Sequence, residues 1–158
     1  MKHYFGFVLF PGGTISLFLA VTSLATADWV NSGTVSMTSF GLWQECVDYT
    51  CFTLTDVPSY LNAVRAFLIT SCVTSVASAI LSLAISVGSK PRTAVDASMM
   101  LTYLASTILL ATGMVVYTVE QPLPYPTRYG YSFVLGWLAV ALCFVCSTVG
   151  IFAVIKSR

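Results

Sequence analysis

The sequence predicts an all-α membrane protein, a four-helix transmembrane bundle that carries a small extracellular antiparallel β-sheet. Only 8% of its 158 residues are charged and 57% are apolar, whereas soluble domains carry about 25% charged residues. The apolar residues gather in four long uncharged stretches, and one long loop joins the first two stretches. A chain of this length accommodates one domain, so we assign residues 1–158 to a single membrane domain.

Each of the four uncharged stretches is long enough to cross a bilayer, because a helix needs about 20 apolar residues to span the hydrocarbon core. A helix also satisfies its own backbone hydrogen bonds, which lipid does not do. With their flanking turns, the stretches predict spans at about residues 4–27, 62–87, 95–119 and 131–155. The loops at 28–59 and 120–130 then lie on one side of the membrane.

The first stretch also has features of a secretory signal peptide. Lys2 precedes it, and Ala25-Thr26-Ala27 at its end fits a small-x-small cleavage site. Its apolar run is longer than the about 7–15 residues of a signal's apolar segment. We therefore expect this stretch to be retained as the first span.

Lysines and arginines in the short loops predict the orientation, because these residues favour the cytoplasmic side of a membrane. Five of the seven fall on the side of the termini and of the middle loop: Lys2, Lys90, Arg92, Lys156 and Arg158. Only Arg65 and Arg128 fall on the opposite side. We therefore expect a plasma-membrane protein with both termini in the cytoplasm and the loops at 28–59 and 120–130 outside.

Small residues recur on one face of each of the first two predicted helices. They are Gly13, Ser16, Ala20, Ser23 and Ala27 in the first, and Ser71, Ser75, Ser78, Ser82 and Ser86 in the second. Inside lipid, small residues mark the places where helices approach one another closely. We expect both faces to form seams of a compact bundle; a polar channel lined by the serines is the alternative.

The long loop contains apolar residues that alternate with polar ones, at Val35 and Met37 and again at Phe52 and Leu54, which is the period of half-exposed strands. Cys46 and Cys51 are the only cysteines outside the predicted spans. An extracellular compartment is oxidising, so these two cysteines are expected to form a disulfide. We predict a small antiparallel sheet whose strand register the disulfide fixes.

The residue types exclude several classes of function. The sole histidine is His3, so no nucleophile has a partnered base. Zinc needs four N or S ligands, whereas only Cys46 and Cys51 lie outside the spans and His3 lies on the opposite side of the membrane. No acid, histidine or lysine lies inside the four uncharged stretches, which argues against pumps and ion-coupled transporters. No basic patch is available to meet nucleic acid. We expect no enzyme activity, no cofactor and no metal; the expected partners are the lipid bilayer and either a second copy or another membrane protein.

An ordered set of residues resembles a family signature. Trp29 follows the first span, Gly41-Leu42-Trp43 lies in the loop with Cys46 and Cys51, and Arg65 opens the second helix. This set resembles the W-GLW-C-C signature of the claudin and peripheral myelin protein superfamily. The stretch Arg65-Ala66-Phe67 and the segment 129–137 (YGYSFVLGW) are most similar to the branch of epithelial membrane proteins and lens fibre membrane proteins.

The resemblance implies a claudin-like fold and specific roles for the signature residues. Trp29, Leu42 and Trp43 are expected to anchor the sheet on the bilayer surface, since tryptophan favours the membrane interface. Arg65 is expected under the sheet, where its several donors satisfy carbonyls of the loop; a ligand-binding role is the alternative. Many claudins end in Tyr-Val, whereas this chain ends in Lys156-Ser157-Arg158, so binding to junctional scaffold domains is not expected.

The function expected from these features is a structural or adhesion protein of cell contacts. Apolar side chains at loop tips are the candidate contact residues, because exposed apolar patches mark interaction surfaces: Met37, Phe40, Leu123 and Tyr125. They could instead pack on the sheet or dip into the lipid headgroups. One alternative is an auxiliary subunit of a channel or receptor, with the small-residue helix faces against a partner. Another is a paracellular pore in which Glu45, Asp48 and Asp56 favour cations.

Overall fold

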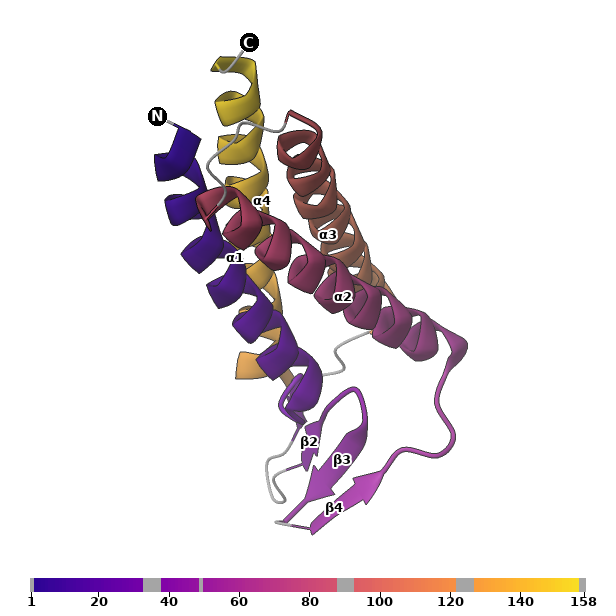
Figure 1. Ribbon diagram of the computed structural model, residues 1–158. Coiled ribbons are helices and arrows are strands. Elements are labelled where there is room, and N and C mark those ends of the chain that lie inside the picture. The colour runs from indigo at the N-terminus through magenta and orange to yellow at the C-terminus, as the bar shows by residue number, and fades with distance from the viewer. Residues whose placement is uncertain (1, 33–37, 49, 88–92, 122–126, 157–158) are drawn as a thin grey trace.

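Four helices and a five-stranded sheet make up the computed structural model, which describes residues 2–32, 38–48, 50–87, 93–121 and 127–156. The helices are α1 (Lys2–Ala25), α2 (Ser59–Val87), α3 (Thr93–Glu120) and α4 (Tyr131–Lys156). Both termini lie at one end of the bundle and the sheet lies at the other (Figure 1). The predicted fold class, a four-helix membrane bundle with a small antiparallel sheet, is confirmed.

Three helices contain segments that are long and apolar enough to cross a membrane: Ser59–Ala84, Ala97–Glu120 and Tyr131–Phe152. In α1 the described apolar part, Leu9–Ala25, is shorter. α1 ends at Ala25, two residues before the expected end of the first span. α2 begins at Ser59, three residues before the expected start of the second span. The early start of α2 follows Pro58, whose carbonyl accepts the amide of Leu61 at 3.0 Å.

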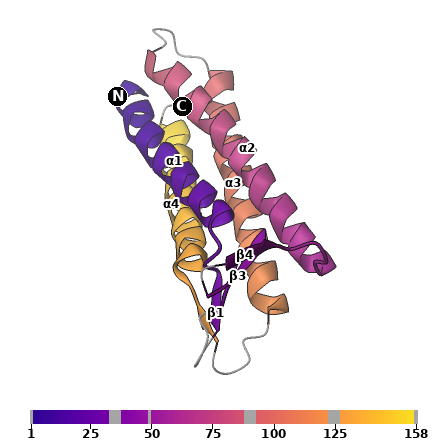
Figure 2. The ribbon, with the colours of Figure 1, turned by 90° about the horizontal axis from the view of Figure 1, so that it is seen from below.

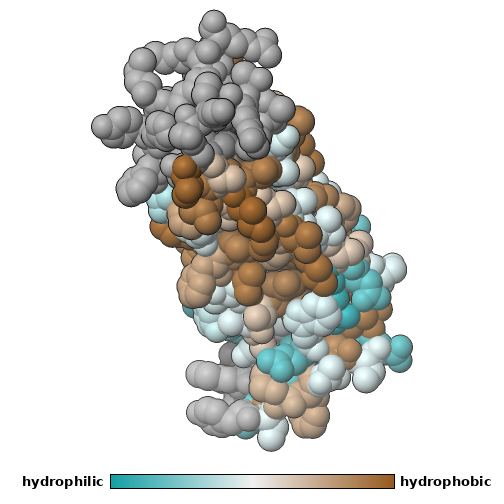
Figure 3. Space-filling model, viewed as in Figure 1, coloured by the Kyte–Doolittle hydropathy of each residue, from teal (hydrophilic) through white to brown (hydrophobic). Residues whose placement is uncertain are grey.

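Each helix packs against two neighbours: α1 and α3 both contact α2 and α4 (Figures 1 and 2). The predicted small-residue faces form these contacts, because Ser16, Ala20 and Ser23 on α1 are all buried. On α2, Ser71, Ser75, Ser78 and Ser82 are buried as well. The outer faces of the helices are apolar instead, as the surface in Figure 3 shows over the middle of the bundle. The predicted seams are therefore confirmed.

The buried hydroxyl groups bond across the helix contacts. Ser75 of α2 pairs with Ser106 of α3, whose hydroxyl also donates to the Ser71 carbonyl at 3.1 Å. Ser16 of α1 donates to the Ala139 carbonyl of α4 at 3.0 Å. No buried side-chain nitrogen or oxygen of the described residues lacks a hydrogen-bond partner. The serines therefore bind helix to helix, which supports the seam interpretation over the channel.

Tyr103 of α3 joins three helices at one point. Its buried hydroxyl donates to the Leu9 carbonyl of α1 at 3.0 Å and lies 3.2 Å from the Ser82 hydroxyl of α2. The ring fits because Gly13 has no side chain: a Cβ there would lie 2.2 Å from the Tyr103 hydroxyl oxygen. At this crossing Gly13 therefore makes room for the Tyr103 hydroxyl, which links the helices by hydrogen bonds.

The sheet contains segments from both loops on its side of the bundle. Its strands are β1 (Val30–Ser32), β2 (Thr38–Phe40), β3 (Gln44–Val47), β4 (Thr50–Thr53) and β5 (Arg128–Tyr129). They are antiparallel in the order β4-β3-β2-β1-β5. β5, from the loop between α3 and α4, was not predicted; it is only two residues long, too short for a periodic pattern.

The strand alternation predicted for the long loop is only partly present. Phe52 lies in β4 as expected, but all four residues of β4 are exposed, so its apolar side chain is not on a buried face. The residues of β4 are exposed because this strand lies at the outer edge of the sheet. Leu54 follows the strand and packs on the core. Val35 and Met37 lie outside the described residues.

The Tyr103 crossing leads to a stability prediction. Tyr103→Phe removes the hydroxyl that links α3 to α1 and α2 while keeping the ring, so the free energy of unfolding in mild detergent should fall by about 1 kcal/mol. Equilibrium unfolding of the purified protein measures this change. Tyr131→Phe, at an exposed tyrosine, is the matched control and should leave stability unchanged; equal stability of the two variants would contradict the role given to Tyr103.

Candidate functional site

The sheet meets the helix bundle at Trp29, directly between α1 and β1. Its side chain is fully buried, and its ring packs edge-on against Tyr117 of α3 and Phe133 of α4, with ring centroids 4.7 and 6.2 Å away. The indole Nε1 donates to the Ser23 carbonyl at 2.8 Å. Trp29 therefore anchors the sheet, as expected, but it does so on helix residues that enclose its ring and not on the bilayer surface.

Trp43 lies at the rim of the same junction. Its indole Nε1 donates to the carbonyl of Leu24 at 3.0 Å, and 39% of the residue is exposed. The last carbonyls of a helix have no partner within the helix. Trp29 and Trp43 thus satisfy two consecutive carbonyls, those of Ser23 and Leu24, in the last turn of α1. The two tryptophans of the signature cap one helix end.

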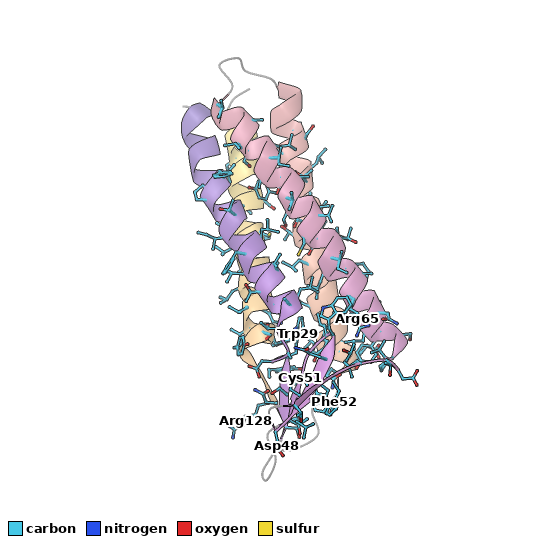
Figure 4. The ribbon with its side chains drawn as sticks, turned by 60° about the horizontal axis from the view of Figure 1, so that its bottom comes forward. Trp29, Asp48, Cys51, Phe52, Arg65 and Arg128 are labelled. Atoms are coloured by element: carbon cyan, nitrogen blue, oxygen red, sulfur yellow. A yellow bond between two sulfur atoms is a disulfide. The ribbon has the colours of Figure 1, made fainter. Side chains whose placement is uncertain are left out.

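Arg65 of α2 lies under the turn that carries Gly41-Leu42-Trp43. Its Nε donates to the Leu42 carbonyl at 2.8 Å, and its Nη2 donates to the same oxygen. Nη1 donates to the Asn62 side-chain oxygen at 3.1 Å, and the guanidinium carbon lies 4.6 Å from the centroid of the Trp43 ring. The Leu42 side chain is fully buried. This one arginine therefore joins the second helix to the loop (Figure 4).

Two glycines allow the chain segments of the junction to approach one another. A Cβ on Gly41 would lie 2.5 Å from the Cα of Ala27, and a Cβ on Gly130 would lie 2.1 Å from the Asp28 carbonyl oxygen. Both contacts involve backbone atoms, which do not move aside cheaply. The absence of a side chain at each position is thus a condition for the sheet to reach α1 and α4.

Asp28 caps the N-terminus of α4, although it lies far from that helix in the sequence. Its carboxylate accepts the amide of Tyr131 at 3.0 Å, and its backbone carbonyl accepts the amide of Ser132 at 3.1 Å. A carboxylate at a helix N-terminus satisfies free amides and favours the helix dipole. Sequence reasoning missed this cap because the capping residue usually adjoins its helix, whereas Asp28 lies 103 positions before Tyr131.

The predicted disulfide joins Cys46 of β3 to Cys51 of β4. The two residues face each other directly in the strand register. Asp48, in the tight turn between them, has a φ of 43°, a left-handed conformation that aspartate tolerates better than most residues. The disulfide therefore closes a short hairpin at the outer edge of the sheet. Among the described residues, no group of three or more His, Cys, Asp or Glu could hold a metal ion.

The four candidate contact residues have different places in the structure. Met37, Leu123 and Tyr125 lie outside the described residues. Phe40 is half-buried and packs against the core beside Trp29 and Leu42. Phe52, which was not among the candidates, is 63% exposed and lies on β4, at the edge of the sheet (Figure 4). Phe52 is thus the exposed aromatic of the described sheet.

The close approach at Gly41 leads to a second stability prediction. Gly41→Ala places a Cβ against the Ala27 backbone, so the sheet must shift from α1 at a cost of about 1–3 kcal/mol. We expect a lower thermal midpoint in detergent and reduced delivery to the cell surface. Gly150→Ala is the matched control, because its Cβ would meet only Met100 at an ordinary 3.9 Å. Normal stability and delivery of Gly41→Ala would contradict the packing at this junction.

Comparisons with known proteins agree with this geometry. The model of the PMP-22/EMP/MP20/Claudin family matches residues 4–153. The human lens fiber membrane intrinsic protein is 30% identical over 143 residues, which cover 84% of this chain and 79% of that protein. The mouse and bovine proteins of the same name are 30% and 29% identical, with the same shares covered.

The family match spans all four helices and the sheet, including Trp29, the Gly41-Leu42-Trp43 turn, the disulfide and Arg65. Proteins of this family are structural membrane proteins and not enzymes. The expected absence of catalytic function therefore agrees with the family. The chain belongs to the PMP-22/EMP/MP20/Claudin family.

Proposed function

We propose that this chain organises membranes at cell–cell contacts, and that it acts through the disulfide-linked edge of its sheet. The observation that supports this proposal is the difference in burial between the strands of the sheet. β1 and β2 supply Val30 and Phe40 to the core, whereas all four residues of β4 are exposed. An exposed edge strand leaves backbone donors and acceptors unpaired and available to another chain.

The proposed orientation has the sheet outside the cell and both termini in the cytoplasm of a plasma-membrane protein. In the sequence, five of the seven lysines and arginines fall in the terminal segments or in the loop between α2 and α3, which supports a cytoplasmic location of those segments. The Cys46–Cys51 disulfide lies at the end of the bundle opposite the termini, and disulfides persist in the oxidising extracellular space. Charge and redox chemistry thus support the same orientation independently.

The contact surface that we propose is the β4 edge of the sheet around Phe52. In the strand register Phe40, Glu45 and Phe52 stand opposite one another across β2, β3 and β4, so their side chains share one face. Phe40 is held on the core, and Phe52 extends the same row beyond it. An aromatic side chain fixed on a short disulfide-closed hairpin loses little conformational freedom on binding. A partner therefore meets a preorganised aromatic edge.

The two other functions expected from the sequence have less support. An auxiliary subunit was expected to offer its small-residue helix faces to a partner helix, but the described serines of these faces are buried inside the bundle. A cation-selective pore would use acids of the loop. Glu45 is half-buried between Phe40 and Phe52 in the register, and only Asp48 and Asp56 are exposed. Phe52 is already exposed, so contact through this residue needs no rearrangement of the bundle or the sheet.

The proposed function is tested by replacing the exposed aromatic. In transfected cells Phe52→Ser should lose most of the enrichment at cell–cell borders and most of the cell aggregation, while total surface delivery stays unchanged because Phe52 lies outside the core. Surface biotinylation and imaging of the borders measure both quantities.

Thr50→Ser is the control for this test, since Thr50 lies on the same strand and the same face and loses only a methyl group. It should behave as the wild type. If Phe52→Ser retains full enrichment and aggregation, or if the wild type shows neither, the contact proposal is wrong.

A further inference from the structure

Arg65 is a half-buried cation with no carboxylate partner among the described residues. Its polar contacts are neutral, namely the Leu42 carbonyl and the Asn62 amide oxygen. Removing a charge from bulk water without an opposite charge is costly. We propose that the missing anion is the phosphate of a phospholipid headgroup, which Arg65 binds at the membrane boundary.

The depth of Arg65 in the membrane supports this source of phosphate. Arg65 is the only charged residue of α2, with the uncharged residues 59–64 before it and 66–87 after it. The longer part, 66–87, has a length of about 33 Å at 1.5 Å per residue. The hydrocarbon core of a bilayer is about 30 Å thick. Arg65 therefore lies where the hydrocarbon ends and the headgroups begin, at the end of the bundle that carries the sheet (Figure 4).

The residues beside Arg65 face the lipid. Asn62, three positions before it, and Ala66, directly after it, are both exposed, and Ile69 one turn deeper is 43% exposed. Trp43, whose ring lies against the guanidinium, is 39% exposed. Tryptophan at such a boundary is typical of the interfacial aromatic belt. The guanidinium thus lies at the outer surface of the protein, above acyl chains and beside an interfacial ring.

The guanidinium retains donors for a phosphate. Arginine has five N–H donors in a rigid fork. Three of them bond to Leu42 and Asn62, so two N–H groups are left. Charge-assisted bonds from arginine to phosphate are among the stronger hydrogen bonds in proteins. The protein contacts fix the orientation of the fork, and the remaining N–H groups bind a headgroup oxygen with little further loss of side-chain freedom.

The site prefers a lipid phosphate over free phosphate for a structural reason. Free phosphate in water would leave its hydration shell to reach a surface flanked by Ala66, Ile69 and the Trp43 ring. A phospholipid already places its phosphate at this depth and covers the same apolar surface with its acyl chains. This inference does not depend on the cell-contact proposal, because it concerns the embedding of the protein in one membrane.

Solid-state NMR with carbon–phosphorus dipolar recoupling tests the contact directly. The full chain, with ¹³C at the arginine Cζ, is placed in phosphatidylcholine vesicles after Arg92→Lys, Arg128→Lys and Arg158→Lys, which keep every positive charge and leave Arg65 as the only arginine. We expect clear ³¹P dephasing of the Arg65 signal. The variant leaves Arg65 and its contacts with Leu42, Asn62 and Trp43 unaltered, and its folding is checked by its disulfide and its monodispersity.

Two controls separate a site from general attraction. In a variant whose only arginine is Arg128, an exposed residue of β5, the dephasing should be absent; folding of that variant is checked by its disulfide and its monodispersity. In vesicles of a phosphate-free glycolipid with inorganic phosphate in the buffer, the Arg65-only chain should also show none.

Three results would overturn the proposal. These are no dephasing of the Arg65 signal in phosphatidylcholine, equal dephasing for Arg128, or dephasing by inorganic phosphate in the glycolipid vesicles. The first would mean that the guanidinium has no phosphate neighbour. The second would show only non-specific attraction to the headgroup layer, and the third would show a free-anion site.

Discussion

The buried indole of Trp29 is the contact through which the sheet and the helices become one structure. It follows the last turn of α1, directly precedes β1, and packs between α3 and α4. Its N–H group satisfies the Ser23 carbonyl, which the end of the helix leaves without a partner. Removal of a buried tryptophan side chain costs about 3–5 kcal/mol. The sheet and the outer helix ends therefore gain or lose their order together.

Around this contact the sheet divides into a fixed part and a free part. Leu42 is buried and its carbonyl is held by Arg65, while Asp28 joins the same region to the start of α4. Beyond these contacts, β4 is held by β3 and by the disulfide alone within the sheet, and its residues are exposed. A rigid base with an accessible edge is the arrangement that a contact protein needs.

The sequence was sufficient for features that depend on composition and local period. Four apolar stretches predicted the helices, the serine stripe of α2 predicted a buried seam, and Cys46 and Cys51 predicted the disulfide. The burial of Trp29 was missed, because tryptophan near a membrane suits an interface as well as a core, and only the packing of α3 and α4 decides between them. The Asp28 cap and β5 were missed because each joins segments about 100 positions apart, without a local pattern.

Hydrogen exchange of the protein in lipid nanodiscs tests the central role of Trp29 most directly. Trp29→Phe keeps an aromatic ring but removes the indole N–H group and part of the buried volume. The structure predicts faster exchange in β1, in β2 and in the sheet-side turns of α1 and α4 together, with the middle of the bundle unchanged. Faster exchange confined to the sheet, or no change at all, would contradict the claim that Trp29 couples the sheet to the helices.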